Sequence, residues 1–143
     1  MEAAPANSPD EWVDLASRCH AAAVLLAKDP KTAPRAWNEA GFAVECMIKA
    51  VIMKQQRLNR WPDRQERPDL WVHNLRALFK IAGAEVGPAD EYAAAVVTMF
   101  DWNRSHSYNS RNVPPKVISG YMEAAFGDKG VVSWLSRTFL NAA

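Results

Sequence analysis

The sequence predicts a single all-helical domain, and three observations support this fold class. Apolar residues recur at intervals of three and four over long stretches, as they do along one face of an α-helix. The sequence has neither the alternation typical of strands nor a heptad run long enough for a coiled coil. It has 143 residues, 49% hydrophobic and 23% charged, which is ordinary for one globular domain with its own core. We therefore expect a helical domain over residues 9–141, preceded by a flexible N-terminus at residues 1–8.

The first two predicted helices have the clearest signals. Residues 8–11 read Ser-Pro-Asp-Glu, which combines a capping hydroxyl, a first-turn proline and acids at the positive end of the helix dipole. An apolar stripe from Trp12 to Leu26 then predicts a helix to about Lys28. Residues 33–58 have the longest apolar stripe, so we expect a central helix there. Within it, Gly41 is a point where a neighbouring backbone could approach closely.

The second half of the chain predicts shorter helices joined by polar segments. Residues 59–70 contain two prolines and no periodicity, which predicts a loop. A short helix is expected at 74–82, where Gly83 ends it, and another is expected from 87–90 to about 103. Residues 104–115 are a polar connection. The last helical region starts at Pro114-Pro115, and the glycines at 127 and 130 could kink or split it.

Composition excludes several classes of protein. The net charge of +1 argues against a generally basic nucleic-acid coat protein, so any contact with nucleic acid must be local. Cys19 and Cys46 are the two cysteines, each within an apolar helical pattern, and we interpret both as reduced core thiols. The chain has no signal-peptide pattern at residues 1–8 and no apolar run near the ~20 residues of a membrane span. We expect a cytoplasmic protein that does not enter a membrane.

The sequence also lacks the common cofactor motifs. There is no glycine-rich phosphate loop, no clustered Cys/His spacing for a metal and no Gly-x-Ser-x-Gly elbow. We therefore predict neither a metal nor a cofactor.

Several short motifs, in order, resemble those of the HEPN family. Residues 43–45 read Ala-Val-Glu and residues 48–50 read Ile-Lys-Ala, similar to the Ala-x-Glu and Leu-Lys-Ala of the family's second helix. His73-Asn74-Leu75 is similar to the His-Asp-Leu that opens its third helix. Residues 102–108, with a Trp at the start and a Tyr at the end, and Trp134-Leu135 extend the resemblance across nearly the whole chain.

The resemblance implies a fold and a range of functions. HEPN proteins are up-and-down bundles of four or five helices and are usually dimers. They include RNA-cleaving toxins, phage-defence effectors and inactive modules that bind RNA or a nucleotide. A homodimer is therefore expected, also because six tryptophans are many for one small core. A nucleotidyltransferase-type antitoxin is the protein partner that the family suggests.

Two functions remain open because one family motif is only half present. Many nuclease members have Arg, four to six residues, then His at the end of the fourth helix, often with Tyr two residues later. His106-Ser107-Tyr108 matches the second part, but Asp101 stands where the shortest spacing would place the Arg. One reading is a metal-independent endoribonuclease of a toxin–antitoxin or phage-defence system. The other is a non-catalytic module that binds a nucleotide or a partner.

Metal-free RNA cleavage requires a base, an acid and cationic groups near the phosphate, and residue types of this kind occur after the fourth helix. The predicted catalytic residues are His106 as acid or base, Arg104 at the phosphate, and Glu45 orienting either of them. The predicted substrate-binding residues are Tyr108, Arg111, Lys49 and Asn103. Lys49 also stands four residues after Glu45, the spacing of a simple helical ion pair. We predict purely structural roles for His73 and Asn74, with Asn74 capping the third helix.

Overall fold

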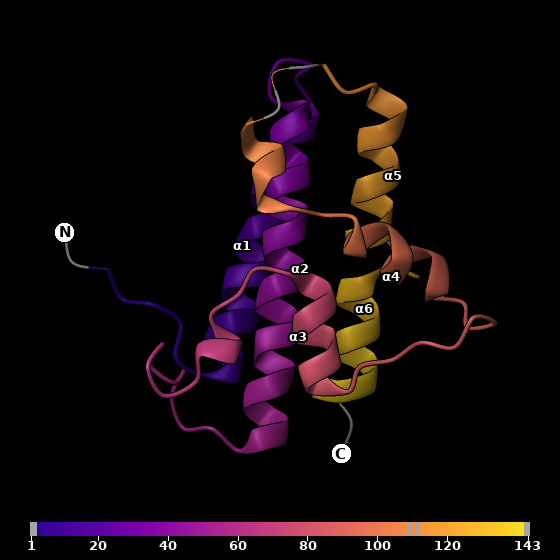
Figure 1. The fold of residues 1–143 in the computed structure, drawn as a ribbon. Coiled ribbons are helices and arrows are strands. Elements are labelled where there is room, and N and C mark those ends of the chain that lie inside the picture. Colours follow the sequence, from indigo (N-terminus) through magenta and orange to yellow (C-terminus); the bar gives the residue numbers. More distant parts are fainter. Residues whose placement is uncertain (1–2, 109, 111, 142–143) are drawn as a thin grey trace.

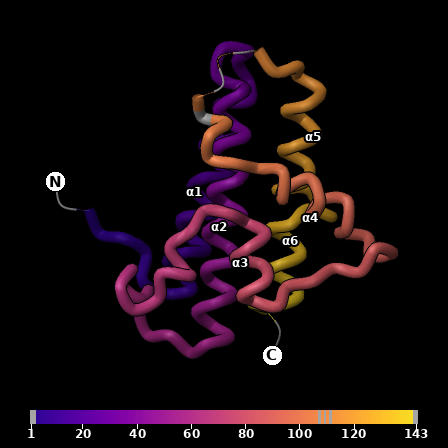
Figure 2. The backbone as a smooth tube through the Cα atoms, in the orientation of Figure 1, coloured from indigo at the N-terminus to yellow at the C-terminus, as the bar shows by residue number. Residues whose placement is uncertain are grey.

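The computed structural model describes residues 3–108, 110 and 112–141, and the regular secondary structure in those residues is all helical, with no strand. Helices α1 (Pro9–Ala27) and α2 (Ala33–Gln56) run side by side in opposite directions (Figures 1 and 2). The central helix is α2, which contacts α1, α3 (Leu75–Ala82), α5 (Pro115–Phe126) and α6 (Val131–Leu135). Helix α4 (Ala93–Phe100) packs against α5, α3 and α6. The predicted all-helical class and the central position of the second helix are confirmed.

Helix ends follow the local sequence signals. The Ser8 hydroxyl accepts a hydrogen bond from the Glu11 amide at 3.1 Å, as expected for the cap of α1. The Asn74 side chain caps α3 in the same way, accepting from the Ala77 amide at 3.0 Å, so its predicted role is confirmed. Gly83 ends α3 with a φ of 63°, a left-handed conformation that favours glycine.

Three segments differ from the prediction. The helix expected from residues 87–90 begins at Ala93, because the Asp90 carboxylate accepts from the Tyr92 amide and forms a turn there. The helix also ends at Phe100, before the expected 103. The polar connection after it contains a 3-10 helix, η2 (Arg104–Tyr108), and the loop after α2 contains another, η1 (Pro68–Leu70). The last helical region splits at residues 127–130 into α5 and α6, followed by a π-helical turn, η3 (Ser136–Leu140).

Most of the tryptophans fit within one chain, which removes one argument for a dimer. Trp12, Trp37, Trp102 and Trp134 are all at most 9% exposed. Trp61 is half-buried and meets Trp12 edge-on, with 5.4 Å between the ring centroids. Trp71, at 42%, is the large exposed one. The number of tryptophans therefore gives no reason to expect a second copy, and the dimer remains an expectation of the family resemblance.

The N-terminal segment lies along the loop after α2, at the left of Figure 1. The side-chain oxygen of Asn7 accepts a hydrogen bond from the Trp61 amide at 2.6 Å, and Ala6 packs on the core. The two segments support each other beside the start of α1.

The cysteines are both buried and free, on α1 and α2. The pKa of the Cys46 thiol is raised because it shares a hydrogen bond with Cys19 and because it is buried. Both thiols therefore behave as core groups. No helix in the described ranges has the length and hydropathy that would let it cross a membrane.

Candidate functional site

A glycine on α2 fixes the position of the segment after α4. The Trp102 indole lies directly against Gly41, where a Cβ atom would overlap the ring. Trp102 is 4% exposed, and it meets Phe42 edge-on with 5.8 Å between the ring centroids. Gly41 was predicted to allow close approach of a backbone, but an indole ring uses the space. Because Trp102 lies two residues before the start of η2, this contact places η2 along the surface of α2.

The position of η2 brings Arg104 next to His73, which in turn contacts the Glu45 carboxylate. His73 Nδ1 lies 2.9 Å from Glu45 Oε1, and Lys49 Nζ lies 3.0 Å from Glu45 Oε2. Arg104 Nη1 lies 3.3 Å from His73 Nε2 and 3.5 Å from His73 Nδ1, and its guanidinium carbon is 4.8 Å from the centre of the Phe42 ring. We call Glu45, Lys49, His73 and Arg104 the Glu45 cluster. It joins residues from α2, from the start of α3 and from η2.

The contact with Glu45 determines which ring nitrogen of His73 keeps its lone pair. Because a carboxylate accepts hydrogen bonds, His73 places Nδ1–H toward Glu45. In the neutral ring the lone pair is then on Nε2. Arg104 Nη1 is nearly equidistant from the two ring nitrogens, so it is not aligned with the Nε2 lone pair. The His73 side chain is 49% exposed, so the imidazole ring lies at the surface of the protein.

Lys49 has a different role from the one predicted for it. It was expected to bind substrate, but its side chain is 9% exposed and paired with Glu45. Its ammonium group lies 5.1 Å from the ring centre of Trp12 and 5.3 Å from that of Trp61. This arrangement encloses Lys49 between two aromatic rings, where it neutralises a buried carboxylate. The i,i+4 pairing with Glu45 is confirmed.

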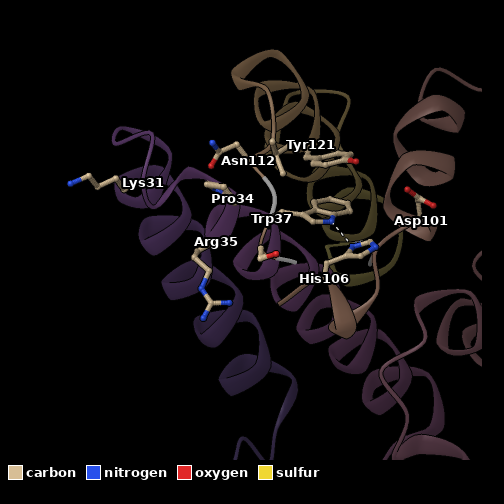
Figure 3. Close-up of a pocket in the computed structure, with 10 residues that line it drawn as sticks. Lys31, Pro34, Arg35, Trp37, Asp101, His106, Asn112 and Tyr121 are labelled. Atoms are coloured by element: carbon tan, nitrogen blue, oxygen red, sulfur yellow. Dashed lines mark hydrogen bonds between the residues drawn. The ribbon is translucent and has the colours of Figure 1, made fainter. Parts of the chain in front are cut away.

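Glu45 was predicted to orient His106 or Arg104, but its carboxylate contacts His73. His106 is hydrogen-bonded to Trp37. The Trp37 indole N–H donates a hydrogen bond to His106 Nδ1 at 2.8 Å (Figure 3). Since an indole N–H only donates, Nδ1 must be unprotonated, and the neutral His106 ring carries its proton on Nε2. Trp37 and Glu45 are eight residues apart on α2, or about 12 Å along the helix axis. The two histidines thus belong to two neighbouring parts of one surface.

Trp37 and His106 line a cleft of 330 Å³, which we call the Trp37 pocket. Tyr121 of α5 stacks on Trp37 with 3.7 Å between the ring centroids and an angle of 19°. Asp101, directly after α4, lies on one side of this pair, and Lys31 and Arg35 lie on the other, with their charged ends extending away from Trp37 (Figure 3). The pocket therefore combines aromatic rings, one acid and two cations.

Two of the remaining predicted residues, Tyr108 and Asn103, lie in or next to η2. Tyr108 is 89% exposed at its end, so its ring is accessible to a ligand. The Asn103 side chain accepts from the Ser105 amide at 2.8 Å and so starts η2, which is a structural role where substrate binding was expected. Arg111 lies outside the described residues.

The sequence did not connect two residues to this surface. His73 was given a purely structural role, and the apolar stripe of the central helix gave no sign that the buried Trp37 donates its indole N–H to His106. The signal for His73 was the placement of Glu45 in an apolar stripe, because a buried carboxylate requires polar partners from other elements. Helical periodicity does not show which residue this partner is, and in the structure it is His73, just before α3.

The described residues contain no group of three or more His, Cys, Asp or Glu side chains arranged to hold a metal ion. A scan against protein-family models finds no match, and searches of curated proteins and of solved structures find none either.

Proposed function

We propose that this protein is a HEPN-type protein that binds RNA and cleaves it without a metal, using the Glu45 cluster as its reactive centre. The observation that supports this best is the contact of His73 with a buried carboxylate on one side and a guanidinium on the other. A carboxylate that holds a histidine in one tautomer is the usual arrangement of an imidazole base. A guanidinium beside it suits a phosphate group.

The proposed reaction is transfer of the phosphate within the RNA chain. His73 Nε2 takes the proton of the ribose 2′-hydroxyl, the 2′-oxygen attacks phosphorus, and the bond from phosphorus to the 5′-oxygen breaks. Arg104 donates hydrogen bonds to the phosphate oxygens, where negative charge grows in the transition state. The products are a 2′,3′-cyclic phosphate and a 5′-hydroxyl, whose proton comes from solvent water.

Lys49 supports this chemistry through its buried ion pair with Glu45. Because Lys49 already balances the carboxylate charge, Glu45 can accept from His73 without requiring a second cation. His73 can therefore direct Nδ1–H toward Glu45 and keep on Nε2 the lone pair that a base requires.

A non-catalytic nucleotide-binding module is the second candidate, and one observation favours it. His106, the histidine of the half-matched family motif, has its Nδ1 occupied by Trp37 and offers only a donor, Nε2–H. A neutral imidazole N–H is a poor acid, but it is a good hydrogen-bond donor to a ligand. In this candidate the surface binds RNA or a nucleotide and leaves it intact.

The wider setting comes from the family resemblance. We infer a homodimer in the cytoplasm and, for a toxin, a nucleotidyltransferase-type antitoxin as the partner. All four residues of the Glu45 cluster lie in the motifs that support the resemblance: Glu45 in Ala-Val-Glu, Lys49 in Ile-Lys-Ala, His73 in His-Asn-Leu, and Arg104 in residues 102–108.

The test is cleavage of a labelled single-stranded RNA in excess chelator by wild type, His73→Ala and His20→Gln. We expect wild type to produce 2′,3′-cyclic phosphate ends and His73→Ala to be roughly 100-fold slower or more. His20 is the matched control, because it stacks on Phe126 between α1 and α5, away from the Glu45 cluster. A substrate with 2′-deoxyribose at the cleaved position should stay intact.

The outcomes separate the two candidates. Equal cleavage by wild type and His73→Ala would remove His73 from the mechanism. No cleavage by any of them, with RNA or nucleotide raising the melting temperature of the wild type, would establish the binding module in place of the nuclease.

A further inference from the structure

Residues 59–71, in the loop between α2 and α3, contain three arginines and three acids that are unequally paired. Two of the arginines each donate two hydrogen bonds to one carboxylate, at 2.8–3.0 Å: Arg60 to Glu66, and Arg67 to Asp69. The pKa of Arg60 is raised by Glu66 and further by the third acid, Asp63, which therefore lies near that pair. In the part of the chain that the structure describes, exposed Arg64 makes no ion pair. The uncompensated positive charge of this segment is thus at Arg64.

The Arg64 guanidinium lies over an exposed tryptophan, Trp71. Its central carbon is 5.3 Å from the centre of the Trp71 ring, which is a cation–π contact. The Trp71 indole N–H donates a hydrogen bond to the Pro62 carbonyl at 2.8 Å, and this bond fixes the orientation of the ring. Trp71 nevertheless remains 42% exposed, compared with 6% for Trp37. An oriented aromatic ring and a positive charge therefore lie together at the surface.

Trp71 is close to the Glu45 cluster along the chain. It directly follows η1, and His73 comes two residues later, a separation that spans at most about 7 Å between Cα atoms. Figure 1 shows the chain running up from η1 toward η2 before it enters α3. His73 in turn contacts Arg104 of η2. A strand of RNA with a phosphate at Arg104 can therefore place a neighbouring base at Trp71.

The chemistry of Trp71 and Arg64 suits a nucleotide whose base is not already stacked. Every base has a π-face that can pack on an indole, whereas the bases of a duplex stack on one another. A guanidinium donates hydrogen bonds to phosphate oxygens. Because stacking does not read the edge of a base, this contact adds affinity without a sequence preference.

We propose that Trp71 and Arg64 bind one nucleotide of single-stranded RNA, next to the phosphate held by Arg104. The base packs on the exposed part of the Trp71 ring, and Arg64 donates hydrogen bonds to the phosphate of the same nucleotide. The inference rests on the proposed function, since it places a further part of the RNA on which the Glu45 cluster would act. Binding at Trp71, however, does not require cleavage.

The experiment measures binding of a short labelled 2′-O-methyl RNA, which the proposed reaction cannot cleave, by fluorescence anisotropy. A second probe has the same backbone and length but no bases. The proteins are wild type, Trp71→Ala, Trp71→Phe and Arg64→Gln. The matched control is Arg60→Gln/Glu66→Gln, which removes a neutral pair from the same loop. Melting curves verify that each variant is folded.

We expect Trp71→Ala to weaken RNA binding roughly fivefold or more, the loss of one stacked base, and to leave binding of the abasic probe unchanged. Trp71→Phe retains a ring and should bind RNA nearly as tightly as wild type. Arg64→Gln should weaken binding of both probes and lower the slope of log Kd against log salt by roughly one. The double variant should bind both probes like wild type.

Four results would overturn the proposal. The first is equal RNA binding by wild type and Trp71→Ala, and the second is no RNA binding by wild type. The third is an equal loss in Trp71→Phe, because the hydrogen bond to Pro62 would then matter and the ring would not. The fourth is an equal loss of the abasic probe in Trp71→Ala, which would mean that Trp71 acts only by holding the loop.

The result is also separable from the nuclease test. RNA binding that depends on Trp71, without cleavage, would overturn only the proposed catalysis. Cleavage that depends on His73, with RNA binding unchanged in Trp71→Ala, would overturn only the nucleotide site at Trp71.

Discussion

His73 contacts η2 and His106 is part of η2, and each is held by a residue of α2, but the two partners are opposites. Glu45 can only accept a hydrogen bond from His73, whereas the Trp37 indole can only donate one to His106. His73 therefore exposes a nitrogen lone pair, and His106 exposes an N–H group. The comparison shows that the partner on α2 decides whether a histidine offers a base or a donor.

The two partners also differ in what they require from the rest of the fold. The Glu45 carboxylate is buried and charged, so it depends on Lys49 as well as His73. The Trp37 indole is neutral and depends on packing against Tyr121. A substitution that disturbs the Glu45 pair should therefore lower the free energy of unfolding more than one that disturbs Trp37.

The largest effect is expected for Lys49→Met, which removes the cation that balances Glu45. An uncompensated buried charge costs roughly 3–5 kcal/mol, so the free energy of unfolding measured in urea should fall by about that much. In Glu45→Gln/Lys49→Met the charge is absent from both positions, and most of the loss should be recovered.

The control for this variant is Arg18→Met. Arg18 and Asp14 on α1 have the same i,i+4 spacing, with 2.9 Å between the charged groups, but their side chains are 75% and 61% exposed. Its loss should cost about 0.5 kcal/mol or less. If Lys49→Met costs no more than Arg18→Met, the carboxylate is not in a dry environment and His73 has no buried partner to orient it.

The helices were predictable because they depend on local signals, whereas the site depends on contacts between distant segments. Ser8, Asn74 and Gly83 mark helix ends through their own backbone and side-chain chemistry, and the structure confirms each. The start of α4 was placed too early because the turn at Asp90 had the composition of a helix cap. A capping residue and a turn residue are chemically the same there, so sequence alone could not separate them.

The residues of the site were only partly predictable for a similar reason. Glu45 and Arg104 were named as candidates, and the structure brings both to His73. His73 itself was missed because its neighbour Asn74 explained the motif as a helix cap. The partner of His106 is 69 residues away in sequence, and periodicity assigns Trp37 to a core face without showing that its N–H reaches another segment.

Gly41→Ala is expected to have the next largest effect, because it disturbs both histidines' surroundings at once. The added Cβ overlaps the Trp102 indole, which must move and carry η2 with it. Overpacking of this kind costs about 1–3 kcal/mol, so the melting temperature should fall, and binding of RNA or nucleotide should weaken.

Gly120→Ala provides the contrast within α5. A Cβ at Gly120 meets no atom within 4 Å, so this change should leave stability equal or raise it by about 0.5–1 kcal/mol. Equal melting of wild type and Gly41→Ala would show that Trp102 does not fix the position of η2.

The smallest effect is expected for Trp37→Phe, which tests the comparison most directly. Phenylalanine retains an aromatic ring against Tyr121 but cannot donate to His106, and loss of one hydrogen bond costs about 1 kcal/mol. Nitrogen NMR of the imidazole rings in the neutral form should show wild-type His73 protonated at Nδ1 and His106 at Nε2. In Trp37→Phe the His106 signals should change while those of His73 stay the same. A wild-type His106 protonated at Nδ1 would contradict the hydrogen bond from Trp37, and with it the view that α2 assigns opposite roles to the two histidines.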